Sequence, residues 1–275
     1  MGTPFFKMTG SGNDFVFVDG RVAPLAAWPG DRIAAACHRR NGVGADGLVL
    51  LEPEGENVVR MHYFNADGGR AALCGNASLC STRLAVRLGM AEPKGMTLRT
   101  DAGDLQTRCV GPGHMAELRF PAFPVPPGVE LDWVAGESGR AWLGDIGVPH
   151  LIILVEDLAA VDVAARGREL RFAPQFAPGG TNVNFVGVTR GPGGPAWRIR
   201  TYERGIEGET MACGTGTICA AFALASQGLV ELPVRMTTAS GSELAVAGRI
   251  EGNLSEDVWL CGEGRLVFTG ELDGV

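Results

Sequence analysis

The chain has 275 residues, of which 45% are hydrophobic and 20% charged, and its net charge is −7 at pH 7. This is typical of a globular protein with one large domain or two ordinary ones, and the negative charge without a basic block predicts no nucleic-acid partner. No apolar run reaches membrane-spanning length and residues 1–13 do not resemble a signal peptide, so we expect no membrane partner and a cytoplasmic location.

Three segments of the first half combine a glycine-rich turn with an apolar strand, and three segments of the second half follow the same pattern. Consecutive apolar residues of this kind are typical of buried strands. Counterparts lie 137 positions apart in the first pair and 139 positions apart for Tyr63 and Tyr202. The pairs are 12–19 with 149–156, 42–51 with 179–182 and the strand after it, and 63–68 with 202–205.

Each half then contains a Cys-Gly pair at the start of an apolar segment. Cys74 and Cys213 are 139 positions apart, and a glycine closes each segment at the same offset, at Gly89 and Gly228. Residues 217–227 carry no charge, and the first segment carries only two arginines. Because a helix that is apolar on all sides is buried, we predict two equivalent buried helices that begin at these cysteines.

This duplication predicts an α+β fold of two pseudo-symmetric repeats, each a mostly antiparallel sheet or barrel wrapped around a central buried helix. The proline-dense run 120–128 separates the halves, and 264–272 is predicted to be a final strand that returns to the first half. We therefore place an N-terminal repeat domain at residues 1–121 plus 263–275 and a C-terminal repeat domain at residues 122–262.

The other cysteines and the lysines restrict the possible chemistry. Seven cysteines without a Cys-x-x-Cys pair predict free thiols rather than disulfides. The four dispersed histidines give no zinc-binding spacing, so we expect no metal. Only Lys7 and Lys94 occur, and neither lies near a phosphate-binding glycine motif, so we expect no pyridoxal phosphate. The cysteines interpreted as core residues are Cys37, Cys80, Cys109, Cys219 and Cys261.

The two Cys-Gly pairs suggest acid–base chemistry. A thiol at a helix start lies at the positive end of the helix dipole, which favours the thiolate. A thiolate removes a proton and a thiol delivers one, so two such groups on opposite faces of one carbon would invert a stereocentre. The backbone N–H groups that follow each cysteine would bind a substrate carboxylate. A thiol redox protein with a reversible disulfide between Cys74 and Cys213 is an alternative.

Five motifs, in order over almost the whole chain, resemble the diaminopimelate epimerase family. The resemblance implies a cofactor-independent enzyme that converts LL- to meso-diaminopimelate, a small amino-acid substrate, for lysine and peptidoglycan synthesis. It also implies two pseudo-symmetric domains and assembly as a homodimer. The motifs are Gly10-Ser-Gly-Asn-Asp-Phe15, Gly42-Val-Gly-Ala-Asp-Gly47, Asn65-Ala-Asp-Gly68 with Cys74-Gly-Asn76, Gly147-Val-Pro-His150, and Glu203-Arg-Gly205 with Cys213-Gly-Thr-Gly216.

The resemblance further implies roles for individual residues. Cys74 and Cys213 would be the two acid/bases, and His150 and Glu203 would tune them. The residues that would hold the reacting end of the substrate are Asn13, Gly75, Asn76, Gly214 and Thr215. The residues that would hold the distal amino-acid end are Asn65, Asn182, Glu203 and Arg204.

Five positions depart from the family pattern and bear on substrate recognition. The family often has Asn at Val148, Gln at Gly47, Ser-Glu at Gly69-Arg70 and Arg at Leu79. A two-thiol racemase or epimerase of another amino acid, such as histidine or hydroxyproline, is therefore a second alternative. Arg204 favours diaminopimelate, because a guanidinium gives a second carboxylate a partner.

Overall fold

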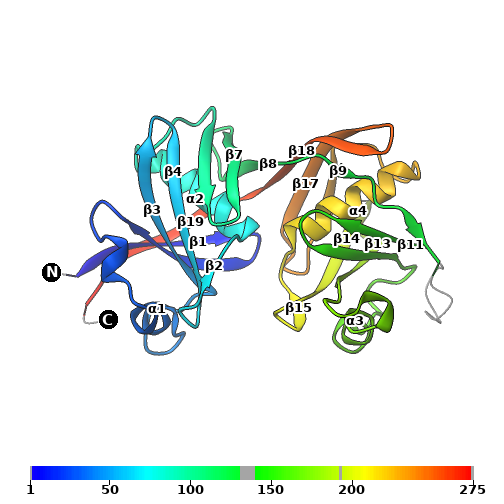
Figure 1. Cartoon of the computed structure of the whole chain (residues 1–275), viewed down its shortest axis with the longest axis horizontal. Coiled ribbons are helices and arrows are strands. Elements are labelled where there is room, and N and C mark those ends of the chain that lie inside the picture. The colour runs from blue at the N-terminus through cyan, green and yellow to red at the C-terminus, as the bar shows by residue number, and fades with distance from the viewer. Residues whose placement is uncertain (1, 131–139, 192–193, 274–275) are drawn as a thin grey trace. The chain divides into compact units, whose positions relative to one another are not determined.

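The computed structural model describes residues 2–130, 140–191 and 194–273 (Figure 1). The chain divides into two compact units, Met1–Arg119 with Cys261–Val275 and Phe120–Leu260. Within the described ranges, no helix is both long and apolar enough to cross a membrane.

Unit 1 places strands around the helix α2. This helix packs against β1, β3, β4, β6, β7 and β19, while the shorter α1 packs against β3. The elements are β1 Thr3–Gly10, β2 Asn13–Asp19, the short 3-10 helix Leu25–Ala27, α1 Gly30–Cys37, β3 Gly47–Gly55, β4 Val58–Asn65, β5 Arg70–Ala71, α2 Gly75–Arg87, β6 Met96–Thr100, β7 Gly103–Val110, β8 Met115–Phe120 and β19 Arg265–Leu272.

Unit 2 repeats this plan around the helix α4. This helix packs against β11, β12, β13 and β17, and α3 packs against β13, β14 and β15. The elements are β9 Phe123–Pro124, β10 Gly128–Val129, β11 Ala141–Asp145, β12 Pro149–Leu154, α3 Val163–Arg171, the 3-10 helix Pro174–Phe176, β13 Asn182–Gly191, β14 Gly194–Glu203, β15 Gly208–Thr210, α4 Gly214–Ser226, β16 Val234–Thr237, β17 Glu243–Glu251 and β18 Leu254–Glu263.

The strand pairing is the same in both units. In unit 1, β2–β3 is parallel, β3–β4 antiparallel, β4–β6 parallel and β6–β7 antiparallel. In unit 2, β12–β13, β13–β14, β14–β16 and β16–β17 follow the same sequence of directions. The predicted α+β fold of two pseudo-symmetric repeats is confirmed. The predicted final strand is β19, which pairs antiparallel with β1 from Thr3 opposite Leu272 onward.

Both predicted helices begin at their cysteines. Cys74 and Cys213 are the N-cap residues of α2 and α4, with extended backbone at φ −142° and −124°. The extended backbone turns the chain into the helix at the following glycine. Each helix ends before a glycine with left-handed backbone, Gly89 at φ +67° and Gly228 at φ +66°, which is the conformation that closes many helices.

The two helices are buried by different means. Residues 216–224 of α4 are buried and apolar except for Thr217. In α2 the buried face includes Ser78, Ser81 and Thr82, whose hydroxyls donate to backbone carbonyls one turn earlier at 2.8–2.9 Å. Because each hydroxyl is satisfied inside the helix, the polar residues do not prevent burial.

The two tyrosines matched by the 139-residue spacing lie on different faces of their sheets. Tyr63 packs in the cluster that contains Ala77 and Cys80 of α2, whereas Tyr202 packs in the cluster of α3, against Gly167. Since side chains alternate along a strand, two residues on opposite faces of their sheets are not equivalent. The predicted match of these tyrosines is therefore wrong.

Burial of α4 predicts a large effect of truncating its side chains. Leu224 is completely buried, so Leu224→Ala should lower the free energy of unfolding by about 2–5 kcal/mol through lost burial and a residual cavity. Leu254, which is 44% exposed, is the matched control. Leu254→Ala should change the free energy of unfolding by only about 0.5 kcal/mol. Urea unfolding measures both, and equal effects of the two substitutions would contradict the buried position of α4.

Candidate active site

The Cys213 thiol lies at the end of a chain of polar side chains in unit 2. Its Sγ is 3.7 Å from Oγ1 of Thr215, whose hydroxyl lies 3.0 Å from Nε2 of His150. His150 is fully buried on β12. Burial, with the nearby charge of Arg204 as a second cause, lowers the pKa of His150 to about 3. The imidazole next to this thiol is therefore neutral at physiological pH.

The Cys74 thiol in unit 1 has a different neighbour, the phenol of Tyr63. Tyr63 donates to Oδ1 of Asn65 at 3.2 Å. Burial raises the pKa of Tyr63, and a hydrogen bond to the Cys74 thiol together with its charge raises it further. The phenol beside Cys74 therefore keeps its hydrogen, which it donates to Asn65.

Asn13 and Asn76 are joined at the start of α2. Nδ2 of Asn76 donates to Oδ1 of Asn13 at 2.8 Å, and Nδ2 of Asn13 donates to Oδ2 of Asp46 at 2.9 Å. Asp46 and Asp14 in turn accept from Arg39, and Asp14 also pairs with Lys7. This cluster orients the Asn13 amide, and through it that of Asn76, beside the helix start.

The predicted distal residues in unit 2 lie at the junction of β13 and β14. Asn182 donates to the carbonyl of Pro149 at 2.9 Å and accepts from the backbone N–H of Arg204 at 2.8 Å. Glu203 accepts from Thr210 at 2.9 Å, and burial raises its pKa. In these contacts Arg204 uses its backbone N–H and not its guanidinium. The guanidinium therefore stays available to bind an anion.

The structure thus groups the predicted site residues within each unit. Asn13, Asn76 and the α2 start form one group with Cys74, and His150, Thr215 and Cys213 form another. Asn65 joins the first group through Tyr63. Sequence reasoning missed the polar roles of Tyr63, Asp46 and Asn184. Asn184 lies two positions after Asn182 and faces α4, so strand alternation was the signal that could have found it.

The cysteines interpreted as core residues have other surroundings. Cys37, Cys80 and Cys219 are buried, and burial raises the pKa of each thiol, for Cys37 to about 11. Cys109 and Cys261, on β7 and β18, are only partly buried. In residues 2–130, 140–191 and 194–273, no group of three His, Cys, Asp or Glu side chains is placed to hold a metal ion.

The sequence model of the family described as "Diaminopimelate epimerase" matches residues 5–119 and 143–254. A diaminopimelate epimerase of Gemmatimonas aurantiaca is 45% identical, covering 98% of this chain and 99% of that protein. One of Aquifex aeolicus is 37% identical, covering 98% and 97%.

The chain belongs to the diaminopimelate epimerase family. Its relatives and the family match support diaminopimelate epimerase activity, an isomerase reaction on an amino-acid substrate. Solved structures share the fold at lower identity. A putative phenazine biosynthesis PhzC/PhzF protein from Clostridium difficile has a TM-score of 0.71 at 16% identity, covering 98% of this chain and 99% of that one. A hydroxyproline epimerase from Agrobacterium vitis has a TM-score of 0.60 at 16% identity, covering 98% and 92%.

Two departures from the diaminopimelate epimerase pattern have a packing explanation. At Gly47 a Cβ would lie 2.5 Å from the backbone carbonyl oxygen of Phe64 and 2.8 Å from the ring of Tyr63, so there is no room for a side chain. Leu79 is completely buried in α2, where an arginine would be costly without a partner. Val148 is partly buried beside the turn that precedes β12.

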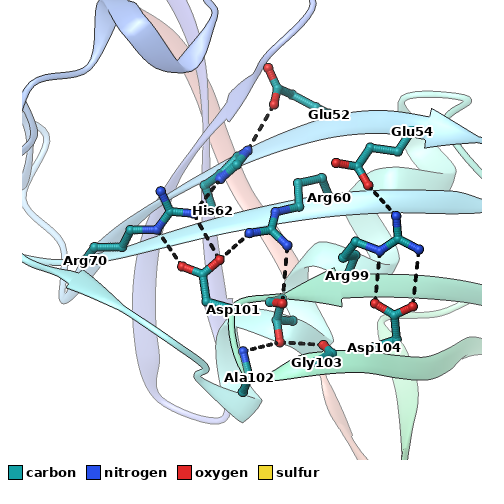
Figure 2. A network of polar contacts seen from close by, with 11 residues as sticks. Glu52, Glu54, Arg60, His62, Arg70, Arg99, Asp101, Ala102, Gly103 and Asp104 are labelled. Carbon is teal, nitrogen blue, oxygen red and sulfur yellow. Dashed lines mark hydrogen bonds and ion pairs between the residues drawn. The ribbon is translucent and has the colours of Figure 1, made fainter.

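A third departure, Arg70, belongs to an ion-pair network between β4, β5 and the β6–β7 turn (Figure 2). Arg70 pairs with Asp101 and contacts Nδ1 of His62 at 3.2 Å, and Asp101 also pairs with Arg60. The hydrogen bond from Arg70 lowers the pKa of Asp101. Nε2 of His62 lies 3.0 Å from Glu52. In this chain Arg70 therefore fastens the segment that leads to Cys74 to the sheet.

The Asp14 cluster predicts a pH-dependent contribution to stability. Burial raises the pKa of Asp14, but Arg39 and Lys7 outweigh it and lower the pKa from 3.8 to about 2. A carboxylate with a lowered folded-state pKa stabilises the protein above pH 4, and this stabilisation is lost as pH falls toward 2. Asp14→Asn should therefore cost about 1–2 kcal/mol at pH 7, after allowance for solvent screening, and less at pH 3.

Urea unfolding at the two pH values measures this effect. Asp273→Asn, at an exposed carboxylate, is the control and should leave the unfolding midpoint unchanged at both. A cost of Asp14→Asn that did not shrink between pH 7 and pH 3 would show that the charge of Asp14 is not what stabilises the cluster.

Proposed function

We propose that this chain epimerises LL- to meso-diaminopimelate with Cys74 and Cys213 as its two acid/bases and without a cofactor. Family membership and full-length relatives support the activity. The observation that carries the mechanism is that each thiol belongs to the N-cap residue of one of two equivalent buried helices. The same location in both repeats is unexpected for cysteines that only fill a core.

The reaction needs a base on one face of the α-carbon and an acid on the other. In one direction a thiolate takes the α-proton and becomes a thiol, and the other thiol gives its proton to the opposite face and becomes a thiolate. The proton count is unchanged, and the two cysteines exchange protonation states. The next turnover in the same direction requires those states to be reset by proton exchange with solvent.

The helix starts supply what the intermediate requires. Removing an α-proton places negative charge on the substrate carboxylate, and backbone N–H groups aimed at it lower the barrier. The donors proposed for this are Gly75, Asn76, Gly214 and Thr215, at the positive ends of α2 and α4. Asn13 supports the Asn76 amide.

The distal amino-acid end of the substrate is assigned to Asn65, Asn182, Glu203 and Arg204. Glu203 would hold an ammonium group and Arg204 a carboxylate. This second pair of charges favours diaminopimelate over amino acids with one carboxylate, such as hydroxyproline, although a hydroxyproline epimerase shares the fold. We also propose a homodimer, as the family resemblance implies.

The two-thiol mechanism predicts that each cysteine is required. Cys74→Ala and Cys213→Ala should each abolish epimerisation, because each face of the carbon loses its only acid/base, while the thermal midpoint stays near that of the parent. Epimerisation is followed by the conversion of LL- to meso-diaminopimelate without added cofactor. Cys109→Ala, at a partly buried strand position, is the control and should remain active. Near-normal turnover of either N-cap variant would refute the mechanism.

The distal assignment predicts a role for the planar guanidinium of Arg204. Arg204→Lys should weaken kcat/KM for diaminopimelate by about 2–5 kcal/mol, because an ammonium group cannot reproduce a two-point contact with a carboxylate. Its effect on alkylation of Cys213 by iodoacetamide should be small. Arg198→Lys, on β14 and opposite Gly187 rather than near Asn182, is the control. If Arg204→Lys matched the parent, or the parent preferred a monocarboxylate amino acid, another two-thiol racemase function would replace this assignment.

A further inference from the structure

We propose that Asn184 is a positioning residue that fixes the tautomer of His150 and thereby directs the hydroxyl hydrogen of Thr215 at the sulfur of Cys213. Its catalytic significance rests on the proposed function, but the hydrogen-bond chain does not. All of its members lie in unit 2, on β12, β13, β14 and the start of α4.

The orientation of the Asn184 amide is set by two neighbours. One N–H of Nδ2 donates to the carbonyl of Leu151 at 3.1 Å, and a carbonyl can only accept. On the other side Oδ1 accepts from the hydroxyl of Thr201 at 2.9 Å. A flipped amide would place an oxygen against the Leu151 carbonyl. The nitrogen must therefore be on the side of the amide that faces His150.

The histidine tautomer follows from this orientation. The second hydrogen of Nδ2 points at Nδ1 of His150, 3.2 Å away, so Nδ1 must be the acceptor. The ring is completely buried and neutral, with its pKa lowered to about 3 by burial and by Arg204. A neutral imidazole carries one hydrogen, which must then be on Nε2.

The order of donors and acceptors can be followed from His150 to the Cys213 thiol. Nε2–H donates to Oγ1 of Thr215 at 3.0 Å, so this oxygen is used as an acceptor. The one hydroxyl hydrogen of Thr215 is then available for Sγ of Cys213, at 3.7 Å. A donor favours the charged form of an acceptor, so this arrangement favours the Cys213 thiolate. The other titratable groups that bear on this site are Glu203, Cys219 and Asp145, besides Arg204.

Gly216 provides a second observation that the Asn184 amide belongs in this place. A Cβ at Gly216 would lie 2.2 Å from Oδ1 of Asn184 and 3.3 Å from Sγ of Cys213. In unit 1 the helix position three residues after the cysteine is Ala77, and the strand position 137 residues before Asn184 is Gly47. Unit 1 therefore has its glycine on the strand, and unit 2 has its glycine on the helix. The helix glycine of unit 2 leaves the space that the Asn184 amide occupies.

The test reverses the tautomer with a side chain of the same shape. In Asn184→Asp a carboxylate oxygen faces Nδ1 and requires a hydrogen there, which leaves Nε2 as an acceptor for the Thr215 hydroxyl. The sulfur then loses the hydrogen bond from Thr215. Imidazole ¹⁵N shifts should report the Nε2–H tautomer in the parent and the Nδ1–H tautomer in Asn184→Asp.

Alkylation measures the effect on the thiol without substrate. The rate of iodoacetamide modification of Cys213 is followed against pH by mass spectrometry of its peptide, and Cys74 in the same sample is the internal control. In Asn184→Asp the pKa of Cys213 should rise by about one unit, which slows its alkylation about tenfold at pH 7, while Cys74 is unchanged.

Two substitutions of Thr215 keep the test decisive if Asn184→Asp folds poorly. Thr215→Val removes the donor and should reproduce the alkylation shift at Cys213, whereas Thr215→Ser keeps the hydroxyl and should resemble the parent. An Nδ1–H tautomer in the parent would overturn the proposal, as would an unchanged Cys213 profile in Thr215→Val. Because no substrate is used, these results are independent of whether the chain acts on diaminopimelate.

Discussion

The N-cap position of a cysteine on a buried helix is the constraint on which both halves of this protein depend. An N-cap residue has extended backbone and its carbonyl accepts the first helical hydrogen bond, here from residue 78 or 217. The thiol is then fixed beside the unsatisfied N–H groups of the first turn. Strands of the same unit bury each helix on several sides. The sheet of each unit therefore fixes the position of one helix start.

Much of the fold was predictable because the duplication is visible in the sequence. The Cys-Gly starts, the closing glycines and the uncharged second helix predicted α2 and α4, and the structure confirms them. The spacing of the tyrosines was misleading, because the loops between the repeats differ in length and a shift of one residue moves a strand side chain to the other face. In the strand β14 this shift brings Thr201 rather than Tyr202 toward α4. Register of this kind is determined by tertiary pairing that the sequence pattern does not contain.

The sequence motifs name candidate site residues, but they do not give the hydrogen bonds between them. The motifs identify His150 and Thr215, but the direction of the hydrogen bond between them depends on Asn184, a residue outside every motif. Likewise Arg70 looks like a change in the substrate site when only the sequence is compared, whereas the structure places it in an ion-pair network with Asp101. A departure from a family pattern can thus be a change in packing rather than in recognition.

The two units surround their cysteine thiols with different side chains. Unit 1 combines Gly47 on the strand with the large Tyr63, whose phenol reaches Cys74 directly. In unit 2, Asn184 lies 137 residues after Gly47 and accepts from the hydroxyl of Thr201. A chain through His150 links it to the hydroxyl of Thr215, which lies beside Cys213. Both units place a neutral hydroxyl group beside the sulfur. Neutral neighbours would suit the proposed exchange of protonation states, because a fixed positive charge would hold one thiolate too strongly to accept a proton in return.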